Sequence, residues 1–259
     1  MTKPTITETS TEIPDRFNLT GAELAAITQA FAYQAIRETK NVSHTETTES
    51  NIATVGRGIQ NLSGFRPEAN QIWQVLRDKA GERPISDFLW KVAHGVHKVG
   101  KYWKNIPEYK ERGHCHQCET TEAMEHILFE CQEPGQSQIR GMAEEVWSRT
   151  GNTWPGHDMT TLLGGGLLRF EPVEVQEPNE GSEKKKKKKD GRQRLLTILL
   201  TESAYLIWKL RNERRTREKE HNTNEIMNRW HATIDRRITL DRAMANPVRH
   251  TTERERPSK

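Results

Sequence analysis

Apolar residues return every three or four positions over most of the chain, and no series of segments shows the alternation that predicts strands. After Pro84, for example, Phe88, Val92 and Val96 share one helical face. The pattern therefore predicts a mainly α fold. One predicted helix begins at Thr20, a second runs from Ile52 to Leu62, and two more begin at Pro67 and at Pro84. Two further helices are predicted from Pro134 to Gly151 and from Arg192 to Glu220, and a last one ends near Asp241. The tryptophans on these apolar faces are expected in the core: Trp90, Trp103, Trp147 and Trp208.

All three cysteines of the chain lie in one short segment. Two residues separate Cys115 from Cys118, and seven further residues lead to His126. Cys131 follows after another four. Three thiolates and one imidazole arranged in a tetrahedron are a common ligand set of structural Zn²⁺. Because four protein ligands leave no coordination position for water, we predict one zinc ion with a structural rather than a catalytic role.

The spacing leaves two alternatives open. In one, His114 or His116 replaces His126 as the fourth ligand. In the other, the thiols are unrelated buried side chains and His126 is a surface residue. We favour the zinc site with His126, because the segment from Thr120 to Glu130 has helical character and would present this imidazole just before Cys131.

The same cysteines indicate a cellular compartment. A disulfide framework normally uses an even number of cysteines spread along the chain, whereas three clustered thiols fit metal binding in a reducing environment. The first residues lack the basic and apolar regions of a secretory signal, and no run approaches the roughly 20 apolar residues that span a bilayer. We expect an intracellular protein, in the nucleus or the cytoplasm, with no membrane partner.

Composition divides the chain into five parts. A Thr-, Pro- and Glu-rich N-terminus is predicted to be disordered, and a Glu/Pro-rich stretch that ends in six lysines is predicted to be a linker. Residues 151–168, rich in Gly and Leu, are expected to be compact but irregular. The parts are a disordered N-terminus (1–18), a helical zinc-binding domain (19–168), an acidic and poly-Lys linker (169–191), a pair of long C-terminal helices (192–242) and a disordered tail (243–259).

Charge is distributed unevenly along the chain. Its net charge is +4, but between residues 183 and 220 fourteen Lys/Arg face six Asp/Glu, so the remainder is net acidic. This asymmetry predicts a polyanionic partner that contacts the basic segment. We expect weak, non-specific binding of RNA or DNA. The predicted contacts are Lys184, Lys185, Lys186, Lys187, Lys188, Lys189, Arg192, Arg194, Arg211 and Arg215. The alternatives are a solvated linker for the lysines and a solvated helix face for the arginines.

The Cys/His segment also resembles a known family. Gly113-His-Cys-His-Gln-Cys118, Met124-Glu-His-Ile-Leu128 and Cys131 are similar to the zinc-binding domain at the C-terminal end of non-LTR retrotransposon reverse transcriptases, after the ribonuclease H domain. The resemblance extends over residues 17–242. It includes Thr20-Gly-Ala-Glu-Leu24 with Ala32-Tyr33, Phe88-Leu-Trp-Lys91, Gly100-Lys-Tyr-Trp103, Ile106-Pro-Glu-Tyr109, Ser203-Ala-Tyr-Leu-Ile-Trp208 and Arg211-Asn-Glu-Arg214. It implies retroelement polymerase or ribonuclease H domains as partners.

The chain lacks the catalytic motifs of those polyproteins. A polymerase palm needs paired aspartates to hold two metal ions, and no Asp-Asp pair occurs in this sequence. Ribonuclease H needs four carboxylates, and only Glu23 matches one of them. We therefore predict a non-catalytic, zinc-stabilised nucleic-acid-binding module derived from a retroelement polyprotein. The alternatives are a zinc-stabilised architectural or protein-interaction domain and a degenerate ribonuclease H fragment.

Overall fold

The computed structural model describes residues 28–39, 46–78, 81–170 and 191–245. Helices dominate these residues, in which the only strands are β1 (His114–Cys115) and β2 (Thr120–Thr121). The predicted mainly α fold class is confirmed. Helix α1 (Gln29–Thr39) belongs to a unit of its own, residues 1–44, and the remaining elements form a second unit. The predicted helix start at Thr20, residues 1–18 and the lysine run 184–189 lie outside the described residues.

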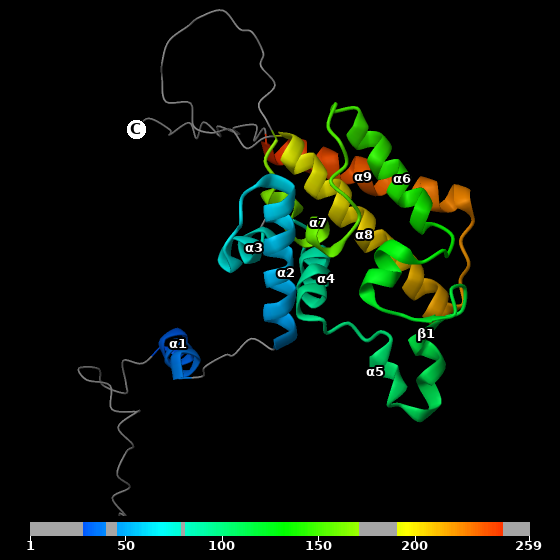
Figure 1. Ribbon diagram of the computed structural model, residues 1–259, viewed down its shortest axis with the longest axis horizontal. Coiled ribbons are helices and arrows are strands. Elements are labelled where there is room, and N and C mark those ends of the chain that lie inside the picture. Colours follow the sequence, from blue (N-terminus) through cyan, green and yellow to red (C-terminus); the bar gives the residue numbers. More distant parts are fainter. Residues whose placement is uncertain (1–27, 40–45, 79–80, 171–190, 246–259) are drawn as a thin grey trace, which may run out of the picture. The chain divides into compact units, whose positions relative to one another are not determined.

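Figure 1 shows the elements of the second unit in the order of the chain. Most are short helices, and the last two are long, as the sequence predicts. The elements are α2 (Glu46–Ser63), α3 (Ala69–Leu76), α4 (Arg83–His94), α5 (Lys101–Lys104), the 3₁₀ segment η3 (Pro107–Gly113), β1, β2, the π-helical turn η4 (His126–Glu130), α6 (Gln136–Ser148), α7 (Met159–Gly164), η5 (Gly165–Leu167), α8 (Gly191–Arg217) and α9 (Thr223–Ala245).

Helix α8 lies at the centre of the hydrophobic core. It contacts α4, α6, α7 and α9, and Figure 1 shows α6 and α9 alongside it. Because neighbours surround this helix, apolar residues occupy most of its circumference rather than one stripe. Leu196, Leu199, Leu206 and Leu210 are all at most 1% exposed. On α9, Ile226, Trp230 and Ile234 are buried at the predicted helical spacing.

A run of glycines lets three helices approach closely. A Cβ atom at Gly164 would lie 2.7 Å from Ile59 of α2, and one at Gly165 would lie 2.7 Å from Leu200 of α8. Such distances are shorter than real Cβ contacts, so a larger residue at either position would force its neighbours to shift. Asp158 caps the start of α7, and its side chain accepts a hydrogen bond from the backbone N–H of Thr161 at 2.7 Å. The prediction of an irregular segment over residues 151–168 is therefore wrong for α7.

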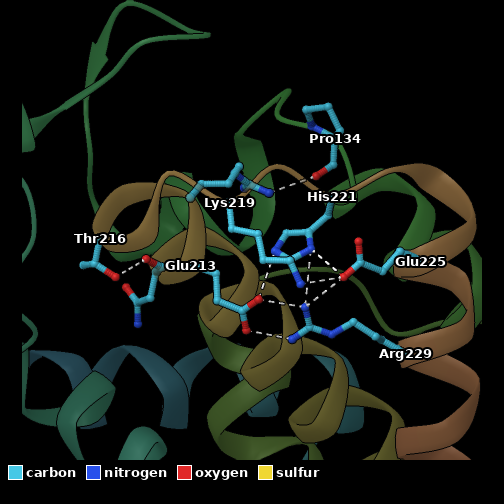
Figure 2. A network of polar contacts seen from close by, with 9 residues as sticks. Pro134, Glu213, Thr216, Lys219, His221, Glu225 and Arg229 are labelled. Atoms are coloured by element: carbon cyan, nitrogen blue, oxygen red, sulfur yellow. Dashed lines mark hydrogen bonds and ion pairs between the residues drawn. The ribbon is translucent and has the colours of Figure 1, made fainter.

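Charged side chains around the buried imidazole of His221 link the end of α8 to the start of α9 (Figure 2). The Nε2 atom of His221 lies 3.0 Å from Glu213, and its Nδ1 atom lies 3.0 Å from Glu225. Arg229 of α9 donates to both carboxylate oxygens of Glu213, at 2.8 and 2.9 Å. These hydrogen bonds lower the pKa of Glu213 to about 2. The carboxylate stays charged and fastens the end of α8 to α9.

Three details of the helices differ from the sequence pattern. Helix α2 begins six residues before the predicted start at Ile52. The negative charge of Glu46 in its first turn interacts favourably with the helix dipole and stabilises this start. Helix α4 ends at His94, so Val96 is 53% exposed instead of lying on its apolar face. Trp90 is 42% exposed, and Trp103 belongs neither to the hydrophobic core nor to the residues packed against it, so the predicted core positions of both are wrong. Within the described residues, no helix combines the length and apolar composition that crossing a membrane requires.

Candidate metal centre

Cys115 and Cys118 lie on a two-stranded hairpin. Strands β1 and β2 pair antiparallel, with Cys115 opposite Thr120. The chain reverses between them, and Glu119 has the left-handed φ of 52°, which non-glycine residues rarely adopt. The backbone N–H of Gln132 donates to Cys118 Sγ at 3.3 Å, which joins the hairpin to the segment that carries the last cysteine.

The other two predicted ligands flank a π-helical turn. The backbone N–H of Cys131 donates to the carbonyl of His126 at 2.8 Å, five residues earlier. In a regular α-helix, positions five residues apart point about 140° away from each other. The wider turn brings them toward the same side, and such turns are frequent at functional sites. Ile127 and Leu128 are 3% and 1% exposed and anchor this turn in the core.

The four predicted ligand residues converge in one cluster. Their ligand atoms all lie within 4.8 Å of one another. Cys131 Sγ lies 3.6 Å from Cys115 Sγ and 3.9 Å from Cys118 Sγ. These distances are far longer than the roughly 2.05 Å of a disulfide, so the thiols are free. Cys115, Cys118, His126 and Cys131 therefore form a group that can hold a metal ion.

The surroundings of the cluster suit a bound cation. The Nε2 atom of His126 is buried and has no hydrogen-bond partner among the described residues. Burial, with a contribution from the neighbouring thiols of Cys115 and Cys118, raises the pKa of Cys131 to about 12. A cation favours thiolates and accepts the lone pair of a neutral imidazole. On the other side of the ring, Glu130 lies 4.0 Å from His126 Nδ1, where a carboxylate can orient a ligating histidine.

The two alternative histidine ligands lie outside this group. His114 and His116 are exposed, whereas His126 is buried, as are the thiols of Cys115 and Cys131. The geometry therefore favours His126 as the fourth ligand.

Close backbone packing holds the hairpin against the chain that precedes it. Gly100 has a φ of 48°, and a Cβ atom there would lie 1.9 Å from the carbonyl oxygen of Glu122. The backbone N–H of Glu122 donates to the carbonyl of Gly113 at 2.9 Å. Only glycine fits at position 100, because a side chain would collide with backbone atoms that cannot move aside.

Ion pairs join the same hairpin to α8. The side chain of Glu122 is 5% exposed and pairs with Arg211 and Arg215 of α8. Its Oε1 atom lies 3.3 Å from Arg211 Nε and 3.5 Å from Arg215 Nε. No pattern in the sequence indicates this role, because an acidic residue is normally solvated.

The structure places the predicted nucleic-acid contacts in several settings. Arg211 and Arg215 have side chains only 11% and 18% exposed in their pairs with Glu122. Arg194 pairs with Asp241 and lies 3.4 Å from Asp78. The guanidinium of Arg192 lies 5.7 Å from the ring centre of Phe170. The arginines thus contact the protein's own side chains, and Lys184 to Lys189 lie outside the described residues.

Comparisons of this chain with protein-family models, with curated proteins and with solved structures gave no match. The resemblance to reverse transcriptase zinc-binding domains stays a prediction.

Proposed function

We propose that this chain is a zinc-stabilised, non-catalytic module that binds nucleic acid. The observation that carries the proposal is the convergence of three thiols and one buried imidazole, within 4.8 Å, on a hairpin and a π-helical turn. Four protein ligands complete a tetrahedron, so the ion would fix the fold without activating water. On this proposal we expect neither polymerase nor ribonuclease H activity.

Zinc is the metal that this ligand set favours. Thiolates select soft or borderline ions, and Zn²⁺ takes three cysteines and one histidine in a tetrahedron with Zn–S distances near 2.3 Å. That geometry separates two sulfurs by about 3.8 Å. The Sγ separations of 3.6 and 3.9 Å from Cys131 lie close to this value.

Metal content tests the site directly. Protein purified under reducing conditions should carry about one zinc per chain by elemental analysis, because one tetrahedral site is available. Cys118→Ser and His126→Ala should each lower this content strongly. His116→Ala is the matched control, since this exposed imidazole lies beside the same thiols and outside the cluster. If the His116 variant lost zinc and the His126 variant kept it, His116 would be the fourth ligand.

Charge supports the nucleic-acid part of the proposal. Residues 183–220 hold fourteen basic and six acidic residues in a chain whose remainder is net acidic. Lysines attract phosphates without reading bases, so binding should be weak and independent of sequence. The resemblance to reverse transcriptase zinc-binding domains agrees with such a partner and suggests retroelement polymerase or ribonuclease H domains as further partners.

A titration with labelled single-stranded RNA and DNA tests this part. Affinity should fall with salt by a log–log slope of about −0.7 for each phosphate contacted on a single strand. An affinity for neither nucleic acid at low salt would contradict the proposal.

The second candidate is a zinc-stabilised architectural domain, and one observation favours it. Arg211 and Arg215, which the sequence assigned to nucleic acid, pair with the buried Glu122 and join the metal-binding hairpin to α8. If zinc is present and nucleic acid does not bind, this candidate replaces the first.

A further inference from the structure

A basic and aromatic surface lies directly before the metal centre, on α5, η3 and the residues around them. Between residues 98 and 116 the chain has five Lys/Arg, two Glu and two His. Lys101, Lys104 and Lys110 are exposed. Tyr102 and Tyr109 are 45% and 41% exposed. Large rings and positive charge thus meet on one surface.

The rings of this surface are ordered by contacts with one another. Trp103 lies with its ring centre 5.0 Å from that of Tyr102 and 6.0 Å from that of Tyr109. The indole N–H of Trp103 donates to the carbonyl of Lys98 at 2.8 Å. The Arg112 guanidinium lies 4.5 Å from the ring centre of Tyr109 and 5.5 Å from that of Trp103. These contacts fix the rings before any partner binds.

Core packing does not account for the tyrosines. Segments α5 and η3 contact each other, and η3 contacts β1 of the hairpin. The hydrophobic core and its partly buried neighbours include neither Tyr102 nor Tyr109. The segment is held instead at the metal centre, by the close approach of Gly100 to Glu122.

We propose that Tyr102 and Tyr109, with Lys101, Lys104 and Arg112, form the surface on which unpaired bases of a single-stranded nucleic acid stack. This inference rests on the proposed function and assigns its contact surface. Every base has a π-face, so exposed aromatic rings bind single strands with little sequence preference. Neighbouring lysines contact the phosphates of the same strand. Guanidinium planes stack on bases as well.

Charge decides the chemistry of the partner. A protein-binding patch is typically apolar at its centre and poor in lysine. Here the two exposed tyrosines lie among several lysines, which suits a flexible polyanion that offers flat rings. Paired bases do not expose their faces, so duplexes should bind more weakly than single strands of equal length.

Fluorescence anisotropy with the zinc-loaded full chain tests this surface. The probes are a 20-residue RNA, a DNA of the same sequence and the corresponding duplex. Changing both tyrosines to alanine should weaken single-strand binding by about tenfold or more. Tyr102→Phe with Tyr109→Phe is the matched control, because it keeps the rings and should keep the affinity. Trp90→Ala removes an equally exposed ring elsewhere and should leave binding unchanged.

The outcomes separate this inference from the proposed function. Zinc content and helicity of each variant are measured first, so that lost folding is recognised. If the alanine variant binds as tightly as the original while replacement of Lys184–Lys189 by serine removes binding, the surface is wrong and nucleic-acid binding stands. If the original protein binds neither RNA nor DNA, both are wrong.

Discussion

Glu202 lies in the middle of α8, 3% exposed, with Arg237 of α9 3.5 Å away. Its side chain lies at a cavity of about 380 Å³, and none of the four predicted metal ligands lies at this cavity. Burial, and secondarily the Glu82 carboxylate, raises the pKa of Glu202 from its ordinary 4.5 to about 7. The folded protein therefore holds this proton more tightly than the unfolded chain does.

This raised pKa predicts a pH dependence of stability. The contribution of Glu202 is fully present below pH 4.5 and is lost as pH rises through about 7. Glu202→Gln should abolish that decline and add about 2 kcal/mol to the free energy of unfolding at pH 8, after allowance for screening. Urea unfolding between pH 4.5 and 8 measures it. The control is Glu49→Gln, at an exposed position. If the unfolding free energy of the Glu202 variant fell with pH as steeply as that of the original protein, this carboxyl would ionise normally.

At the scale of residues, the predicted metal ligands could be identified from the sequence, whereas the residues that surround them could not. The spacing of Cys115, Cys118, His126 and Cys131 predicted the cluster, because few other roles bring thiols and imidazole together in one short segment. Glu122 could not be predicted, since its role depends on Arg211, 89 residues later in the chain. A charge pattern alone does not distinguish a buried ion pair from a solvated one.

At the scale of elements, Gly100 determines how α5 and η3 join the metal centre. Gly100→Ala places a Cβ atom 1.9 Å from the Glu122 carbonyl oxygen at a φ of 48°. We expect a loss of roughly 2–4 kcal/mol in unfolding free energy and faster release of metal to a chelator. Gly141→Ala in α6 is the matched control, because nothing lies within 4 Å of that Cβ position. The Gly141→Ala variant should gain about 0.5–1 kcal/mol in unfolding free energy. Equal effects of the two variants would contradict the role of Gly100.

The helices themselves were largely predictable, and their ends were less so. Apolar spacing located α4, α6, α8 and α9, because each buries a face or its whole circumference. It missed α7, a six-residue helix whose glycines are read as loop residues but permit contact with α2 and α8. The helical character predicted for Thr120 to Glu130 holds for its second half, whereas Thr120 and Thr121 form strand β2. The π form of the turn before Cys131 was not predicted, since an i→i+5 hydrogen bond leaves no mark on apolar spacing.

At the scale of the whole molecule, the candidate metal centre and the main core lie in different parts of the chain. The buried apolar cluster is built mainly by α2, α4, α6, α8 and α9. From residues 98–135 only Met124, Ile127 and Leu128 belong to its fully buried part. The segment that includes the hairpin and the aromatic surface therefore has little apolar burial of its own and depends on the ligand cluster and on Glu122.

Removal of the metal should consequently unfold one region and spare the rest. Structural zinc contributes about 10–16 kcal/mol in small finger peptides, whereas segments with few buried contacts open at low cost. After chelation under reducing conditions, hydrogen exchange should accelerate over residues 100–135. Amides of α2 and α8 should keep their protection, because most of their contacts are with other helices of the core rather than with the segment that carries the ligands. Mass spectrometry of peptides from the metal-loaded and chelated chain makes the comparison, and readdition of zinc should restore protection. A uniform loss across all helices would mean that the ion supports the entire core, and an unchanged hairpin would mean that no metal organises it.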